Sequence, residues 1–206
     1  MFVKSRKKLR ILIASGPTQE PIDPVRFLTN YSTGTMGRHL SSEAVKRGHA
    51  VTRVECPKDA QTALQLEKKL ATLLPKNDVL IMAAAVCDVR PRSFSNTKIK
   101  KDRLSAIPLV KNPDILANLA KIKRNSQIFI GFGLESSNVL GNGFRKLREK
   151  KLEVIVLQKV AKNNLPFGEK PVDVLIVDQQ RKVIKLKSVS KRKLAGILVQ
   201  KAESFC

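Results

Sequence analysis

One unbroken aliphatic run constrains the fold of this chain more than any other feature. Residues 78–86 (DVLIMAAAV) are apolar at every position after the first, without the alternation expected of a strand that has one face in water. Such a run is typical of a strand buried on both faces, as in a parallel sheet covered by helices on either side. The run therefore predicts an α/β fold built on a central parallel sheet.

Shorter aliphatic runs alternate with longer amphipathic stretches along the rest of the chain, which is typical of βαβ units. The predicted strands cover residues 10–14, 51–55, 127–132 and 153–157, and a hairpin covers 172–177 and 182–186. The predicted helices cover residues 37–47, 60–74, 113–122, 139–151 and 191–204. Asn112, followed by Pro113 and Asp114, is predicted to cap the third helix, and Ser190 the last. Because no repeat or linker interrupts the pattern, residues 1–206 are predicted to form a single domain.

Cysteine and histidine are too sparse for several classes of site. Cys56, Cys87 and Cys206 lie far apart in sequence and form no CxxC pair, and the only histidines are His39 and His49. This pattern favours a reducing compartment and argues against a disulfide framework, a zinc cage and a histidine-rich metal site. The longest apolar run is far too short to cross a bilayer, and the amino end lacks the apolar segment of a signal peptide. A cytoplasmic protein without a membrane partner is therefore expected.

Charge is the most unusual global property of the chain. Its 40 Lys and Arg against 17 Asp and Glu give a net charge of +23. Such an excess suits nucleic-acid binding, an enzyme whose substrates are polyanions, or an ordinary solvated surface. Because the basic residues are dispersed along the chain, charge by itself leaves these three interpretations open.

Ligands of parallel α/β sheets bind beyond the carboxyl ends of the strands, and four predicted loops leave such ends: residues 15–36, 87–112, 133–138 and 158–171. In the first loop, residues 32–37 (STGTMG) lead directly into a helix, so their backbone N–H groups could cradle a phosphate. An ordinary glycine-rich turn has the same composition. The GxGxxG motif of dinucleotide-binding folds is absent from the sequence, which argues against an NAD-dependent oxidoreductase.

Six motifs follow one another in order along most of the chain. Residues 16–37 (GPTQEPIDPVRFLTNYSTGTMG) fit the pattern GPTxExIDPVRxIxNxSSGxMG, and residues 83–91 (AAAVCDVRP) fit AAAVADYRP. Residues 98–101 fit KIKK, residues 111–116 fit KNPDIL, residues 131–136 stand in place of GFAAET, and the helix at Ser190 also fits. Together they resemble the phosphopantothenoylcysteine synthetase (phosphopantothenate–cysteine ligase) family. Thr35, Val89 and residues 133–134 and 156–158 depart from its pattern, and the last of these leaves recognition of the nucleotide base open.

The resemblance implies a ligase that joins 4′-phosphopantothenate to L-cysteine in coenzyme A biosynthesis. In the family reaction the carboxylate attacks the α-phosphate of CTP, pyrophosphate leaves, and the cysteine amine displaces CMP from the acyl-cytidylate. Some relatives use ATP, so the nucleotide is expected to be CTP with ATP as the alternative. Mg²⁺ is expected to be held by the triphosphate rather than by protein side chains. A stand-alone form is expected, because no flavin-dependent decarboxylase domain precedes the first predicted strand.

The resemblance also implies roles for individual residues. Asn30, Arg26 and Lys98 are expected to be catalytic: Asn30 would hydrogen-bond an acyl oxygen, Arg26 would supply fixed positive charge, and Lys98 would bind the triphosphate. The expected substrate-binding residues are Arg26, Asn30, Ser32, Gly34 and Met36. The expected nucleotide-binding residues are Gly16, Ala85, Asp88, Lys98, Asn112, Pro113, Asp114, Ile115, Phe132, Lys146 and Lys150. Without the resemblance, most of these positions would be interpreted as ordinary turn, cap, core or surface residues.

At the level of architecture, the resemblance implies a three-layer, Rossmann-like fold with a mostly parallel sheet and helices on both faces. A dimerisation arm or hairpin is expected in addition, with residues 94–112 reaching toward the partner of a homodimer and helping to complete its active site. The alternative is a basic nucleic-acid-binding protein on a Rossmann-like fold. Only the net charge supports that alternative, because the sequence has no helix-turn-helix pattern, zinc spacing or aromatic platform.

Overall fold

The computed structural model describes residues 8–205 of the chain. Its strands are β1 (Arg10–Pro17), β2 (Gln19–Asp23), β3 (Arg26–Thr29), β4 (Ala50–Glu55), β5 (Val79–Ala85), β6 (Val89–Pro91), β7 (Leu109–Lys111), β8 (Ile128–Glu135), β9 (Val154–Lys159), β10 (Val172–Asp178) and β11 (Val183–Val189). Its helices are α1 (Thr35–Lys46), α2 (Ala63–Leu73), α3 (Ile115–Ile122), α4 (Val139–Glu149) and α5 (Lys191–Ser204), with the single-turn helices η1 (Leu74–Lys76) and η2 (Lys101–Arg103). Each strand and helix predicted from the sequence overlaps one of these elements.

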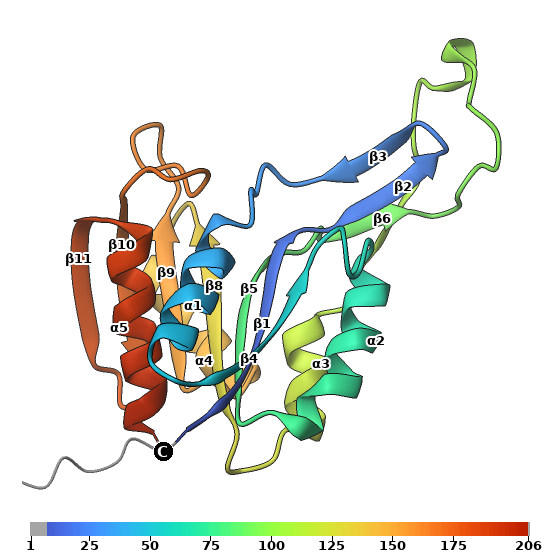
Figure 1. Cartoon of the computed structure of the whole chain (residues 1–206). Helices are drawn as coiled ribbons and strands as arrows, with labels where there is room; N and C mark the ends of the chain where they lie inside the picture. Colours follow the sequence, from blue (N-terminus) through green and yellow to red (C-terminus); the bar gives the residue numbers. More distant parts are fainter. Residues whose placement is uncertain (1–7, 206) are drawn as a thin grey trace, which may run out of the picture.

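Seven strands form one mostly parallel sheet in the order β11-β10-β9-β8-β5-β1-β4 (Figure 1). The strands β4, β1, β5, β8 and β9 are parallel, and β10 and β11 join them as the predicted antiparallel hairpin at one edge. The aliphatic run forms β5, which pairs with β1 on one side and β8 on the other. Its prediction as a strand buried inside a parallel sheet is therefore confirmed. The chain runs from β1 outward to β4 and then back to β5, so the strand order switches between β1 and β5.

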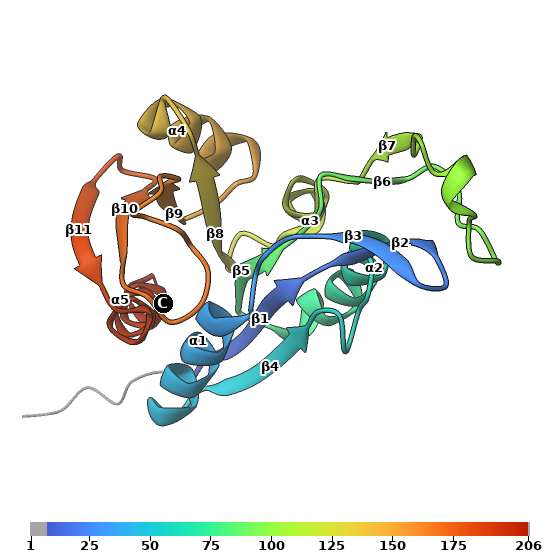
Figure 2. The same ribbon diagram turned by 90° about the horizontal axis from the view of Figure 1, so that it is seen from above.

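Helices cover both faces of the sheet, which confirms the predicted three-layer architecture (Figures 1 and 2). On one face, Leu40 of α1 and Leu198 of α5 pack in the same core as Ile81 of β5. On the other face, helices α2, α3 and α4 pack on the sheet, with Leu66 beside Leu80 in the second core. Neighbouring residues of β5 thus face opposite cores, as the pleat of a strand requires. None of the helices within residues 8–205 is long and apolar enough to cross a membrane.

Two segments predicted to be loops instead contain short strands, so that prediction is wrong for both. Residues 15–36 contain the β2–β3 hairpin, and residues 87–112 contain β6 and β7, which pair antiparallel at the base of a long arm. β2 also contacts β6, and residues 19–29 and 89–111 together project from the sheet (Figure 2). We call these two stretches the extension. Prolines interrupt its short strands, at Pro21 in β2 and Pro91 in β6, and so obscure the strand pattern in the sequence.

The start of α3 also differs from its prediction. The helix begins at Ile115, and its cap is Asp114, whose side chain accepts a hydrogen bond from the backbone N–H of Ala117 at 3.1 Å. Asn112 cannot cap it, because its amide donates to the backbone oxygen of Cys87 at 2.8 Å and accepts from Arg90 at 3.1 Å. The predicted cap at Ser190 is confirmed, since its hydroxyl accepts from the backbone N–H of Lys193.

Candidate functional site

Two adjoining cavities open at the carboxyl ends of β5, β8 and β9, next to the switch in strand order. One has a volume of about 420 Å³ and lies against the starts of α1 and α5; we call it the α1 cavity. The other has a volume of about 280 Å³ and lies against the start of α3; we call it the α3 cavity. Asp88 and Phe132 line both cavities, which therefore form one continuous cleft.

Most residues predicted for the site line this cleft. The α1 cavity contains Asn30, Ser32, Gly34, Met36, Ala85, Asp88, Phe132 and Lys146. The α3 cavity contains Asp88, Asn112, Pro113, Asp114, Ile115, Phe132 and Lys150. Gly16 lies behind Gly34 at the end of β1, while Arg26 and Lys98 belong to the extension. The structure therefore places the predicted residues in two groups, and the role of each remains a prediction.

The turn into α1 requires glycine at two places and leaves the helix end open. Gly34 occupies the cap position with φ of 70°, in the left-handed region, and no side chain caps the helix. Gly16, with φ of 81°, lies behind it, where an added Cβ would lie 2.2 Å from the backbone oxygen of Cys56. The first N–H groups of α1 thus lack a capping side chain beside the cavity, an arrangement that suits a phosphate.

Asn30 is half-buried and faces the end of β5. Its Nδ2 donates to the backbone oxygen of Ala85 at 3.1 Å and approaches the Sγ of Cys87 at 3.8 Å. This second contact is weak, so one amide proton is available to a ligand. Burial raises the pKa of the Cys87 thiol, only partly offset by its contact with Thr18, so Cys87 is a poor nucleophile in this position.

The middle of the cleft combines an aromatic ring with charged groups. Phe132 packs partly against the core below the cavity, and Asp88 is exposed between the two cavities. Lys146 of α4 forms an ion pair with Glu135 at 2.5 Å, so its ammonium is already partly neutralised. A nucleotide that uses Lys146 must share it with Glu135 or displace that carboxylate.

In the α3 cavity, the predicted residues bond chiefly to one another. One carboxylate oxygen of Asp114 caps α3, and the other forms an ion pair with Lys150 at 2.9 Å. Asn112 joins the base of the arm to the end of β5 through its contacts with Arg90 and Cys87. The cap reduces the number of free N–H groups at this helix end, and Lys150 is paired with Asp114 just as Lys146 is paired with Glu135.

Arg26 and Lys98 form the second group, outside both cavities. Arg26 donates to the backbone oxygen of Ile99 at 3.2 Å, and the buried carboxylate of Asp23 accepts from the backbone N–H of the same residue at 3.1 Å. These contacts fix the residue that follows Lys98 in the arm. Arg26 Nη1 is buried without a hydrogen bond, 3.6 Å from Asp23. The extension thus holds Arg26 and Lys98 close together and presents Lys98 on an exposed surface.

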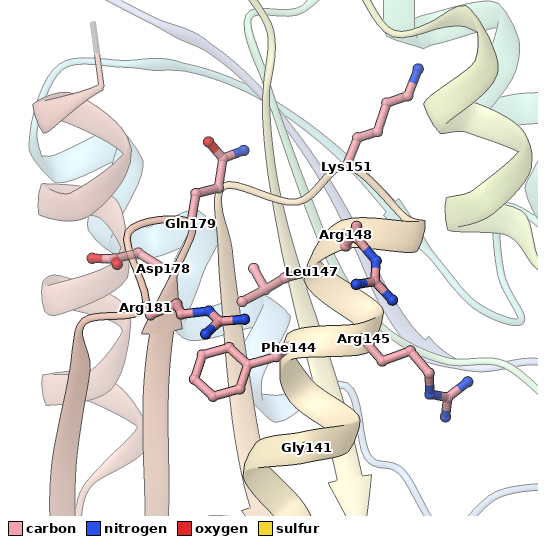
Figure 3. Close-up of a pocket in the computed structure, with 9 residues that line it drawn as sticks. All are labelled: Gly141, Phe144, Arg145, Leu147, Arg148, Lys151, Asp178, Gln179 and Arg181. Atoms are coloured by element: carbon pink, nitrogen blue, oxygen red, sulfur yellow. The ribbon is translucent and has the colours of Figure 1, made fainter.

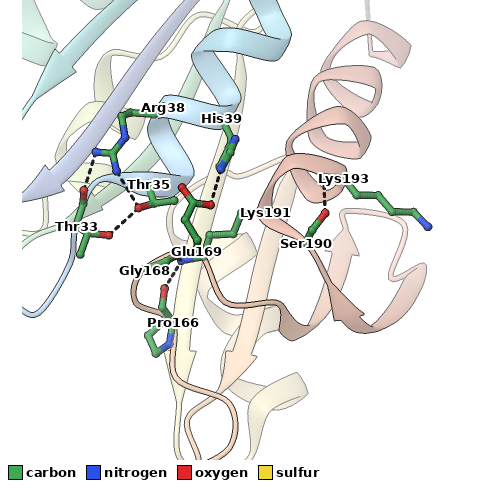
Figure 4. A network of polar contacts seen from close by, with 10 residues as sticks. All are labelled: Thr33, Thr35, Arg38, His39, Pro166, Gly168, Glu169, Ser190, Lys191 and Lys193. Atoms are coloured by element: carbon green, nitrogen blue, oxygen red, sulfur yellow. Dashed lines mark hydrogen bonds and ion pairs between the residues drawn. The ribbon is translucent and has the colours of Figure 1, made fainter.

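Lys191 was not predicted as a site residue, yet it lines the α1 cavity. It is 5% exposed, and its ammonium donates to the backbone oxygens of Pro166, at 2.7 Å, and of Gly168 (Figure 4). Burial lowers the pKa of Lys191, an effect only partly offset by Glu169. The sequence carried one weak signal, since Ser190 and Lys191 belong to a recognised motif, but burial of a lysine depends on tertiary packing that the pattern does not reveal.

Acidic and thiol side chains do not gather into a metal centre. Among the residues that the structure describes, no group of three or more His, Cys, Asp or Glu is placed to hold a metal ion. In the cleft, Asp114 is engaged by Lys150, whereas Asp88 is exposed.

A larger cavity, of about 530 Å³, lies elsewhere, between α4 and the β10–β11 turn (Figure 3). There the guanidinium of Arg181 lies 5.2 Å from the ring centre of Phe144, while Arg145 and Lys151 point away from the ring. Its lining includes none of the predicted site residues. We therefore assign the candidate site to the cleft.

The family model of the DNA/pantothenate metabolism flavoprotein C-terminal domain matches residues 6–205. The chain is 34% identical over 205 residues to a cysteine/cysteine sulfinic acid decarboxylase from an unknown prokaryotic organism, covering 93% of this chain and 57% of that protein. It is 37% identical over 188 residues to the coenzyme A biosynthesis bifunctional protein CoaBC of Borreliella burgdorferi, covering 84% of this chain and 47% of that protein. The chain thus spans about half the length of these curated relatives.

One solved structure matches this chain over nearly the full length of both proteins. The crystal structure of the C-terminal domain of the coenzyme A biosynthesis bifunctional protein CoaBC has a TM-score of 0.75 with this chain and 30% sequence identity. The match covers 95% of this chain and 94% of that domain. The similarity therefore extends over the sheet, the cleft and the extension alike.

Proposed function

Because this chain belongs to the DNA/pantothenate metabolism flavoprotein C-terminal domain family, we propose that its cleft joins 4′-phosphopantothenate to L-cysteine, as a ligase of coenzyme A biosynthesis. The single observation that carries the proposal is the cleft itself. It brings Asn30, the open end of α1, Asp88 and Phe132 together beside the switch in strand order. This combination suits an acid that bears a phosphate next to a nucleotide, and all 206 residues are proposed to act as one domain.

In the proposed reaction, the α3 cavity and the middle of the cleft hold the nucleotide and the α1 cavity holds phosphopantothenate. The substrate carboxylate attacks the α-phosphorus, a phosphorus–oxygen bond breaks, and pyrophosphate leaves with that electron pair. The cysteine amine then attacks the acyl carbon, loses a proton, and the nucleoside monophosphate leaves. Product, pyrophosphate, monophosphate and the proton released from the amine to solvent account for all atoms. The cleft contributes by holding the reacting groups together and by placing dipoles where charge develops.

Asn30 is proposed to act on the acyl carbon. Its amide is anchored to Ala85, and its second proton, which now points to the sulfur of Cys87, can turn to the acyl oxygen as that oxygen becomes negative. A neutral amide supplies this hydrogen bond without competing with the cysteine amine as a nucleophile. Asn30 thus serves the second half-reaction more than the first.

The nucleotide is proposed to be CTP, with Phe132 beside the base and Lys150 near the phosphates. Mg²⁺ would enter with the triphosphate and reduce the electrostatic repulsion between the two anionic substrates. Asp88, an exposed carboxylate in the cleft, would be the residue to contact this ion. Gln158 belongs to the stretch that departs from the family pattern and leaves recognition of the base open. It lines the α1 cavity, and its amide donates to the backbone and side-chain oxygens of Asn164. ATP in place of CTP would leave the reaction unchanged and alter only the contacts of the base.

A homodimer is proposed because the extension has the properties of an interface. Val25, Phe27, Phe94 and Leu109 expose 45–60% of their surface there, more apolar area than a short hairpin and arm leave in water without a partner. Lys98 and Arg26 lie on the same extension, away from their own cleft. A second copy would cover the apolar side chains and bring Lys98 to a cleft.

The buried free thiols of Cys56 and Cys87 fit the reducing environment of the cytoplasm, where we place the protein.

The test is product formation by the purified chain. With phosphopantothenate, Mg²⁺ and cysteine, we expect CTP-dependent release of pyrophosphate and formation of 4′-phosphopantothenoylcysteine, and without cysteine we expect pyrophosphate release limited to about one turnover per site. ATP replaces CTP in a parallel reaction and identifies the nucleotide. A folded sample that forms no product with either nucleotide would contradict the proposal.

A further inference from the structure

The chain between β9 and β10 forms one wall of the α1 cavity. We call residues 160–171 the closing segment; Pro166 and Phe167 from it line the cavity together with Met36 of α1. The ring of Phe167 lies 5.8 Å from that of Tyr31, just before the turn into α1. The segment thus spans from the sheet to the elements that hold the proposed substrate.

The two halves of the closing segment are held differently. Asn164 anchors the first half to the sheet, because its side chain donates to Lys159 and accepts from the backbone N–H of Asp173, and Gln158 donates to its backbone oxygen. These contacts come from neighbouring strands. The second half, residues 166–169, crosses to α1 and α5 and depends on side chains from those helices.

Lys191 is the central contact of the second half. Its Nζ donates to Pro166 and Gly168, on either side of Phe167, and so fixes the backbone that carries the ring (Figure 4). Gly168 has φ of 69°, a conformation that glycine adopts without strain and that other residues rarely adopt. A buried ammonium is costly to place, and bonds to two backbone oxygens compensate for part of its lost hydration.

The other charged groups near this turn hold its edge. His39 of α1 lies 2.8 Å from Glu169, while Arg38 bonds to Thr33 and Thr35 at the start of the helix. Glu169 is exposed, so its pair with His39 is in contact with solvent and contributes less than the buried bonds of Lys191. Lys191 is therefore the contact whose loss opens the second half.

We propose that Lys191 is a positioning residue that fixes residues 166–169 as a wall of the α1 cavity and thereby sets the affinity for the phosphorylated acid. The proposal rests on the proposed function for its substrate, but not for the geometry. The closing segment borders the α1 cavity and not the α3 cavity, so the larger effect is expected on the phosphorylated acid and the smaller one on the nucleotide.

The test compares Lys191→Met, which keeps the length of the side chain and removes its donors, with the control Lys193→Met on the exposed face of the same helix. We expect Lys191→Met to raise the KM for phosphopantothenate about 10-fold or more, as expected for the loss of hydrogen bonds to a charged group, with little change in kcat or in the KM for the nucleotide. In NMR relaxation measurements, the backbone amides of residues 167–169 should become more mobile, while those of 160–165 should not. Lys193→Met should change neither property.

Gly168→Ala provides a second variant should Lys191→Met fail to fold. Open space surrounds the added methyl group, so only the strained φ disturbs the turn. We expect a smaller rise in the KM for phosphopantothenate and a smaller increase in the mobility of residues 167–169 than in Lys191→Met. Unchanged mobility of residues 167–169, or an unchanged KM alongside increased mobility, would overturn the proposal. Absence of product from the unmodified chain would instead refute the proposed function, and the relaxation measurement would still test the positioning role.

Discussion

The cleft and the extension hold their predicted site residues in different ways. In the cleft, the residues lie at the ends of strands and helices whose inward-facing side chains are buried in the two cores. The sheet therefore fixes their positions within one chain. In the extension, Arg26 and Lys98 depend on a small polar cluster around Asp23, and neighbouring apolar side chains are exposed. We therefore expect a second copy of the chain to bring the two groups of residues together, as the proposed homodimer requires.

This difference follows from how much each region can bury. β5 lies between two parallel neighbours and two layers of helices, whereas the β2–β3 and β6–β7 pairs are two-stranded. Two-stranded hairpins are marginal in water unless another surface covers them. We infer that the sheet supports the cleft by itself, and that a partner supports the extension.

The largest expected effect tests the sheet. Leu80→Ala should lower the free energy of unfolding by about 2–5 kcal/mol, because Leu80 is fully buried in β5 and the cavity left behind cannot be filled. Phe94→Ala in the extension should change that free energy by no more than about 0.5 kcal/mol in dilute protein, where the proposed dimer is dissociated. Urea unfolding followed by circular dichroism measures both. Equal losses in the two variants would remove the distinction between the regions.

Next in size is the loss of Asn30. Asn30→Ala should reduce formation of the final product about 100- to 1,000-fold, because the developing charge on the acyl oxygen loses its donor. The first turnover of pyrophosphate should persist, since activation of the carboxylate does not use this amide. The exposed Asn125→Ala serves as control. A matching loss of the pyrophosphate burst would show that Asn30 acts before the acyl transfer.

Lys98 tests the extension directly. Lys98→Met should reduce product formation about 100-fold with unchanged unfolding, because the exposed side chain contributes a charge to the triphosphate and nothing to the core. Lys101→Met removes the same charge from the same arm and should have a much smaller effect. If both variants lost activity equally, the general charge of the arm rather than the position of Lys98 would be responsible.

The smallest expected effect concerns Asp23, whose carboxylate accepts a hydrogen bond from the backbone N–H of Ile99 and so anchors the arm. Burial opposes the charge of Asp23, but the N–H groups of Val25 and Ile99 and the nearby Arg26 outweigh it and lower the pKa of this carboxyl. Since the folded pKa is lowered, the anchor is fully present above the ordinary aspartate pKa and is lost as the pH falls through the lower folded value. In an NMR titration, the amide signals of Val25 and Ile99 should shift together, with a midpoint below the ordinary aspartate value. Asp23→Asn should abolish this shift and reduce activity only a few-fold at neutral pH.

The same contrast explains what the sequence could predict. β5 was recognisable because burial on both faces leaves a continuous apolar run, and the ends of such strands locate a cleft by topology. The strands of the extension were missed, because prolines interrupt them and their pairing joins distant segments. The cap of α3 was assigned to Asn112 because the sequence does not show that its amide bonds to Cys87. Lys191 was missed for a similar reason, since only the folded chain brings residues 166–168 to it.

One measurement tests most directly whether a ligase site combines the cleft of one chain with the extension of another. Asn30→Ala and Lys98→Met chains carrying different tags are co-expressed, and the heterodimer is purified and assayed for 4′-phosphopantothenoylcysteine. Each homodimer should be nearly inactive, whereas the heterodimer contains one site with both changes and one intact site, so it should show about half the activity of the unmodified dimer. A heterodimer as inactive as its parents would contradict the account, because each site would then draw Asn30 and Lys98 from the same chain.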